Sequence, residues 1–244
     1  MRTPFKFLLG LRSIFESIEF DNSENTKVIV LELATAKIVR EYELDCFFGF
    51  HLGNACENGD ELSVDALCVD TMDIMGGLSD VFMERGDDFQ FLANGSRFNR
   101  FTLNLATGDV RKTLIEGAVA GEFPAWNPRC TGRENRYTWL ATIVENGTPY
   151  SFNAFQKVDH QTGELKIHDF GEGRFTSEPN FTPKGENAAE DEGYLVSIVY
   201  NHAREKSEVV IVDAKELQHE LAVIPLEHHV PFGFHGCFYD ETFV

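Results

Sequence analysis

The chain has 244 residues, of which 43% are hydrophobic and 25% are charged. This composition is typical of a globular protein, and the length is within the range of one large all-β domain. Forty acidic residues against 21 basic residues give a formal net charge of −19. A charge of this sign and size repels a polyanionic backbone, so nucleic acid is excluded from the expected partners.

The five cysteines are scattered along the chain and never form a C-x-x-C pair. Scattered cysteines in odd number favour free thiols in a reducing compartment over a disulfide framework. The longest uninterrupted apolar run near the N-terminus, residues 7–9, is too short for a signal peptide. No run approaches the about 20 apolar residues that span a bilayer. We therefore expect a cytoplasmic protein.

A peripheral membrane contact is an alternative for the N-terminal segment, because apolar residues there could form one face with basic residues nearby. The apolar residues are Phe5, Phe7, Leu8, Leu9, Leu11, Ile14, Phe15 and Ile18, and the basic ones are Arg2, Lys6 and Arg12. The interpretation that we favour is that these apolar residues complete a core or form the exposed end of a fragment.

Short runs of β-branched and aromatic residues recur between turn residues, and each has about the length of one strand. In chain order they include KVIVLEL (27–33), RFTLNL (100–105), TWLATIV (138–144), YLVSIVY (194–200) and EVVIVDA (208–214). These runs predict an all-β protein with almost no long helix.

A hairpin pattern repeats among these strands, in which a strand ends in an acidic residue or Asn and a short turn leads into the next strand. The copies are LELATAKIV (31–39), LNLATGDV (103–110), VDHQTGEL (158–165) and IVDAKEL (211–217). Aligned on Glu32, Asn104, Asp159 and Asp213, they are 72, 55 and 54 residues apart. Periods near 50 residues predict about four β-propeller blades, each copy being one outer hairpin. Hairpins of a β-sandwich remain the alternative.

Two of the eight histidines, His51 and His235, lie in apolar surroundings. His51 is part of FFGFHLGNA (47–55) and His235 is part of VPFGFHGCF (230–238), and both follow Gly-Phe. A buried imidazole needs a polar partner. The other six histidines lie in polar segments or beside strands, and we expect surface or structural roles for them.

Several motifs resemble the carotenoid cleavage oxygenases in sequence and in order, over roughly residues 30–240. They are FHLGNA (50–55), EFP (122–124) running into NPR (127–129), RYTW (136–139), SEP (177–179), EDEGYL (190–195), VDA (212–214) and PFGFHG (231–236). The resemblance implies the C-terminal part, about four blades, of a seven-bladed β-propeller. It also implies that residues 1–244 form one partial propeller domain.

The same resemblance implies a non-haem Fe(II) on the propeller axis, which the family holds with four histidines. His51 matches the third of these ligands and His235 the fourth. Glu122 and Glu178 match glutamates that orient ligand histidines. A neutral imidazole suits Fe(II), and its second ring nitrogen needs a fixed acceptor. For Glu57 we expect a structural or electrostatic role.

The implied activity is that of a dioxygenase, which uses O2 to cleave one double bond of a carotenoid or apocarotenoid into two carbonyl products. An apolar substrate predicts an aromatic tunnel. Core packing is the alternative role for each candidate wall residue. These residues are Phe47, Phe48, Phe50, Phe123, Trp126, Phe232 and Phe234.

No histidine precedes His51 in the sequence, whereas the family's other two ligands lie in a preceding half. Two imidazoles alone hold Fe(II) weakly. Three interpretations therefore stay open: an oxygenase completed by a missing N-terminal half, an inactive partial propeller that binds apolar ligands, and a generic propeller used for protein interaction. Stilbene cleavage and retinoid isomerisation also stay open as activities of this fold.

Overall fold

The computed structural model describes residues 8–11, 21–69, 95–144, 151–231, 233 and 235–238. Their regular structure is almost entirely β-strand, in four antiparallel sheets. The first sheet pairs β1 (Thr26–Leu31) with β2 (Ile38–Leu44). The second has the order β3 (Leu52–Asn58), β4 (Glu61–Cys68), β5 (Arg97–Asn104), β6 (Val110–Leu114).

The third sheet has the order β7-β8-β9-β10, so its strands are also neighbours in sequence order. Its strands are β7 (Gly121–Ala125), β8 (Tyr137–Thr142), β9 (Ala154–Asp159) and β10 (Leu165–Asp169). In the fourth sheet β13 pairs with β14 and β14 with β15, while β11 and β12 both pair with β13. The strands are β11 (Arg174–Thr176), β12 (Asn180–Pro183), β13 (Gly193–Asn201), β14 (Lys206–Asp213) and β15 (Glu220–Pro225). Two short 3-10 turns, η2 (Pro128–Cys130) and η3 (His202–Arg204), complete the elements.

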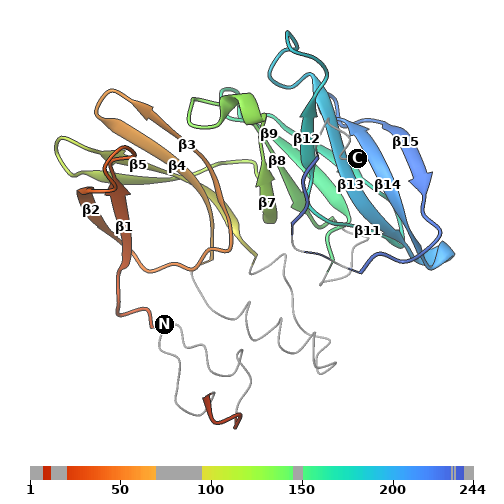
Figure 1. Cartoon of the computed structure of the whole chain (residues 1–244), viewed down its shortest axis with the longest axis horizontal. Helices are drawn as coiled ribbons and strands as arrows, with labels where there is room; N and C mark the ends of the chain where they lie inside the picture. The colour runs from red at the N-terminus through yellow and green to blue at the C-terminus, as the bar shows by residue number, and fades with distance from the viewer. Residues whose placement is uncertain are drawn as a thin grey trace.

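The sheets stand side by side in chain order, from the first sheet at one side of Figure 1 to the fourth at the other. Within the second and third sheets, strands that are consecutive in sequence are also neighbours in space. This is the arrangement of successive propeller blades, as predicted. Among the described residues the first blade consists of one hairpin, and the sheets do not close into a ring.

The repeated sequence pattern forms the turn of the outer hairpin in every sheet. In each copy, the residue four positions after the aligned one donates its backbone N–H to the aligned residue's carbonyl. These four donors all have positive φ; they are Ala36, Gly108, Gly163 and Leu217. The side chains of Asn104, Asp159 and Asp213 also accept two backbone N–H groups each from their turns. The repeat is therefore explained by a local turn that joins the two outer strands.

Replacing Asn104 by alanine is expected to lower the free energy of unfolding by about 1 kcal/mol. The reason is that the backbone N–H groups of Ala106 and Thr107 lose their acceptor, the side-chain oxygen of Asn104. Urea unfolding measures the change. Asn104→Asp keeps an acceptor oxygen and is expected to unfold at nearly the wild-type urea concentration. Equal midpoints for Asn104→Ala and wild type would show that the side chain adds nothing to this turn.

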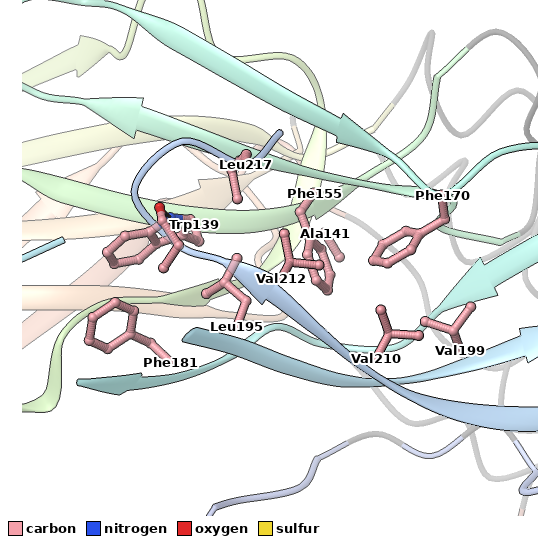
Figure 2. Packing of buried hydrophobic residues seen from close by; sticks show 11 residues of the cluster. Trp139, Ala141, Phe155, Phe170, Phe181, Leu195, Val199, Val210, Val212 and Leu217 are labelled. Atoms are coloured by element: carbon pink, nitrogen blue, oxygen red, sulfur yellow. Dashed lines mark hydrogen bonds between the residues drawn. The ribbon is translucent and has the colours of Figure 1, made fainter. Parts of the chain in front are cut away.

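Hydrophobic clusters fill the three interfaces between neighbouring sheets. The first and second sheets bury Tyr42, Leu44, Ala66, Cys68, Phe101 and Leu103. The second and third sheets bury Leu67, Phe98 and Leu140. The largest cluster lies between the third and fourth sheets, where the side chains labelled in Figure 2 interdigitate around Trp139, Phe155 and Leu195. Each blade therefore depends on its neighbour for the burial of its apolar face.

In the part of the chain that the structure describes, no helix is long and apolar enough to cross a bilayer. The five cysteines form no disulfide. Of the residues predicted for a membrane-facing segment, Leu8, Leu9 and Leu11 are described, and all three are exposed. The others, and the wall candidates Phe232 and Phe234, lie outside the described residues.

Candidate metal centre

Irregularities in the strands position His51, Glu122 and Glu178. His51 directly precedes β3, whose register shifts between Leu52 and Ala55. Glu122 lies at a register shift of β7, where the next residue, Phe123, has a φ of 57°. Glu178 lies in the gap between β11 and β12. Bulges and breaks of this kind redirect side chains out of the regular pleat, which lets residues of three different sheets converge.

The C-terminal segment brings His235 to the same place. After β15, the backbone N–H of Leu226 donates to the carbonyl oxygen of Ser207. The backbone N–H of Val230 donates to the hydroxyl oxygen of Ser207. The ring of His229 then contacts the ring of Tyr200, with centroids 4.9 Å apart. These contacts return the chain along the fourth sheet towards Glu178.

The four predicted residues form two histidine–glutamate pairs that face each other. His51 Nδ1 lies 2.7 Å from Glu122 Oε2, and His235 Nδ1 lies 3.0 Å from Glu178 Oε2. A carboxylate accepts a hydrogen bond, so each Nδ1 is the protonated nitrogen of its ring. The two Nε2 atoms lie 3.4 Å apart. Two neutral imidazoles in this tautomer both present a lone pair, so they need a shared proton or metal ion between them.

The second oxygen of each carboxylate is also bound. Glu122 Oε1 accepts from the hydroxyl of Ser96, and Glu178 Oε1 accepts from the backbone N–H of Gly236. The side chain of Glu122 is 5% exposed and that of Glu178 is 15% exposed. The prediction that Glu122 is not a solvated surface charge is consistent with this burial.

The geometry fits a divalent metal ion with imidazole ligands. Two nitrogens that are each about 2.1 Å from one metal ion lie about 3.0 to 3.4 Å apart when the angle between them is about 90 to 109°. The observed separation of 3.4 Å falls within this range. Among the described residues, no group of three or more His, Cys, Asp or Glu side chains is placed to hold a metal ion. Within the described residues, His51 and His235 together offer two imidazole nitrogens that could hold such an ion.

Aromatic and apolar groups adjoin both histidines, but the side chain of His51 is 17% exposed whereas that of His235 is 60% exposed. The Phe123 ring lies 4.6 Å from the His51 ring and 5.7 Å from the His235 ring, between centroids. A cavity of about 290 Å³ adjoins Glu178 and His235. Its apolar lining includes Val196, Ile198, Tyr200, Val230 and Phe238. An apolar cavity beside a polar centre is the usual arrangement of a small-molecule site.

Of the other predicted wall residues, Phe47 is a core residue, because its ring stacks on that of Phe101 at 5.2 Å. Phe48 and Phe50 contact each other at 4.8 Å, and Phe50 is 41% exposed. Trp126 donates its indole N–H to Thr131. Glu57 is exposed on the β3–β4 hairpin, where it pairs with Leu62.

The described residues thus define a partial β-propeller in which two histidine–glutamate pairs face each other. The chain belongs to the retinal pigment epithelial membrane protein family, whose model matches residues 1–240. It is 29% identical over 231 residues to the apocarotenoid-15,15'-oxygenase of Synechocystis, covering 94% of this chain and 46% of that protein. It is 32% identical over 215 residues to the carotenoid 9,10(9',10')-cleavage dioxygenase 1 of Arabidopsis thaliana, covering 84% of this chain and 38% of that protein.

Solved structures agree with these sequence matches. Cobalt-substituted Synechocystis ACO matches with a TM-score of 0.82 and 26% identity, over 96% of this chain and 48% of that one. An ACO/RPE65 chimera matches with a TM-score of 0.82 and 26% identity, over 97% of this chain and 48% of the chimera. The chain therefore spans about half the length of the relatives it matches. The predicted family, that of the carotenoid cleavage oxygenases, and the predicted fold class, about four blades from the C-terminal part of a seven-bladed propeller, are confirmed.

Proposed function

We propose that residues 1–244 form one partial propeller domain of an oxygenase that cleaves a double bond of a carotenoid or apocarotenoid with O2. The observation that carries the proposal is the pair of Nε2 atoms 3.4 Å apart, each on a ring whose Nδ1 is held by a glutamate. The names of the relatives support the substrate class and the reaction. The cobalt-substituted relative supports a metal ion at the centre.

His51 and His235 would hold Fe(II) through Nε2. When bound, iron supplies the redox chemistry by which O2 is added across a double bond. Glu122 and Glu178 keep the proton on Nδ1 and fix the orientation of each ring, which leaves Nε2 free for the metal. Phe123 and the apolar cavity beside His235 offer a surface to a polyene.

A second candidate function is that of a module that binds apolar ligands without cleaving them. It is supported by the number of imidazoles, since the described residues bring only two together, and two hold Fe(II) weakly. The same apolar cavity would serve as the binding site.

Replacing His235 by alanine is expected to weaken metal binding by about 100-fold or more. Mutation of a residue that hydrogen-bonds to a metal ligand already weakens binding by about 10- to 100-fold, and loss of the ligand itself should weaken it at least as much. Co(II) titration of this chain, followed by its absorption spectrum, measures the affinity. His228→Ala is the control, because His228 is exposed and makes no side-chain contact to the histidine pair in the described structure. Its affinity should equal that of wild type.

Cleavage is tested with an apocarotenal as substrate in the presence of Fe(II) and O2, and the carbonyl products are measured. Metal affinity should fall and cleavage should be lost in His235→Ala, and both should persist in His228→Ala. Equal Co(II) affinity in wild type and His235→Ala would contradict the ligand assignment. A wild-type protein that binds an apocarotenal but neither metal nor O2 would favour the second function.

A further inference from the structure

The Ser96 hydroxyl is the one side-chain group, apart from His51, that bonds to the carboxylate of Glu122 in the described structure. We propose that Ser96 is a positioning residue, which holds Glu122 so that His51 keeps its proton on Nδ1 and presents Nε2 to the metal. The part of this inference that concerns metal rests on the proposed function. The part that concerns the tautomer of His51 does not.

Ser96 contacts the strand of Glu122 at two successive residues. It lies directly before β5 in the second sheet and is 1% exposed. Its carbonyl accepts the backbone N–H of Gly121 at 3.2 Å, and its hydroxyl donates to Oε1 of Glu122. Gly121 itself has no room for a side chain, because a Cβ there would lie 2.7 Å from the carbonyl oxygen of Ala141. Strand β7 is therefore fixed in position against Ser96.

The hydroxyl determines the orientation of the carboxylate. With Oε2 bound to His51 Nδ1 and Oε1 bound to Ser96, the carboxylate of Glu122 has both oxygens engaged, and rotation about its terminal bond would break both contacts. Hydrogen bonds to an ionised acceptor are roughly twice as strong as neutral ones. A buried carboxylate that loses one partner has a strong drive to turn towards another donor.

The two halves of the site differ in how this second contact is made. Glu178 Oε1 is held by a backbone N–H, that of Gly236, which no substitution other than proline removes. Glu122 depends on a side chain from a different sheet. Ser96 is thus the position where the outer contact of one half can be deleted while both histidines and both glutamates stay unchanged.

The test is Ser96→Ala, observed by long-range 1H–15N NMR of the imidazole nitrogens in this chain. In wild type, His51 is expected in a single tautomer with the proton on Nδ1. In Ser96→Ala, His51 is expected as a mixture of tautomers, while His235 stays unchanged. Co(II) affinity is expected to fall about tenfold. Removing a residue that helps to orient a metal ligand usually weakens metal binding by about 10- to 100-fold, and tenfold is the lower end of that range.

Thr142→Val is the matched control. It deletes another fully buried hydroxyl, whose bond to the carbonyl of Ala120 is 2.6 Å long, in the strand that pairs with β7. Thr142 does not contact Glu122, so this variant should lose stability without any change in the His51 tautomer. If Ser96→Ala does not fold, Ser96→Cys replaces it, because a thiol is a weaker donor of similar size. Its expected result is an intermediate tautomer ratio.

A wild-type His51 tautomer in the folded Ser96 variant would overturn the positioning role, as would an equal change in Thr142→Val. If Ser96→Ala changes the His51 tautomer but neither wild type nor the variant binds Co(II), the positioning role is supported and the proposed function is contradicted. The two proposals therefore fail under different results.

Discussion

Replacing Trp139 by alanine is expected to lower the free energy of unfolding by about 4 kcal/mol, the usual cost of deleting a fully buried aromatic side chain. The side chain is 0% exposed and belongs to the cluster between the third and fourth sheets, where Figure 2 shows it beside Phe181 and Leu195. Its ring stacks on Phe181 with centroids 4.6 Å apart. Its indole N–H donates to the carbonyl of Ala214 at 2.9 Å. Deletion leaves both a large cavity and an unsatisfied carbonyl.

The same substitution is expected to disturb the proposed metal centre, because Trp139 contacts the strand of Glu122 and the strand that follows Glu178. It pairs with Ala125 in β7, the strand of Glu122, and it stacks on a residue of β12, the strand that follows Glu178. Co(II) affinity should therefore fall together with stability.

Urea unfolding followed by fluorescence and by circular dichroism gives the stability change. Trp139→Phe keeps an aromatic ring but loses the bond to Ala214, and a loss of about 2 kcal/mol is expected. A loss below about 1 kcal/mol for Trp139→Ala would contradict a shared core between the third and fourth sheets.

The blades were predictable from the sequence because their signal is local. Asn104, Asp159 and Asp213 each bind backbone groups two and three residues ahead, so the turn is encoded within a few positions. The strands beside these turns have the composition of half-buried β-structure. Local patterns do not fix how one blade packs on the next. The resemblance to a known family supplied that arrangement.

The candidate metal centre was predictable only in part, because its contacts also join distant parts of the chain. An apolar setting distinguished His51 and His235, but their glutamate partners are 71 and 57 residues away in the chain. Those partners came from the resemblance. Ser96 was not predicted, because its role depends on the position of β5 beside β7, which belong to different sheets. The positive φ of Phe123 also has no sequence signal, since the residue is not glycine.

His160 is a buried histidine that joins the second and third sheets. Its Nε2 lies 2.9 Å from the hydroxyl of Thr138 and 3.9 Å from a carboxylate oxygen of Asp65, and its side chain is 4% exposed. Burial lowers the pKa of His160 to about 4; the charge of Asp65 acts in the opposite direction and that of Arg100 in the same direction. An unfolded chain has the ordinary histidine pKa of about 6.5. Between these values the unfolded chain binds a proton that the folded chain does not.

The stabilising contribution of neutral His160 is therefore fully present above about pH 6.5. As the pH is lowered towards 4, the free energy of unfolding is expected to fall by about 3 kcal/mol in total from His160. The guanidinium of Arg136 holds the pKa of the neighbouring Asp159 well below its usual range, so Asp159 also stabilises the fold when it is ionised. That contribution is lost only as the pH falls through the ordinary Asp pKa of about 3.9, at the lower end of this range. Urea midpoints measured between pH 7 and pH 4 test this for wild type, His160→Gln and His228→Gln.

His160→Gln keeps an acceptor for the Thr138 hydroxyl but cannot take up a proton, so its stability should depend less on pH than that of wild type. The exposed His228 makes His228→Gln the control, with a pH dependence equal to that of wild type. Parallel pH curves for wild type and His160→Gln would show that His160 titrates alike in the folded and unfolded chain.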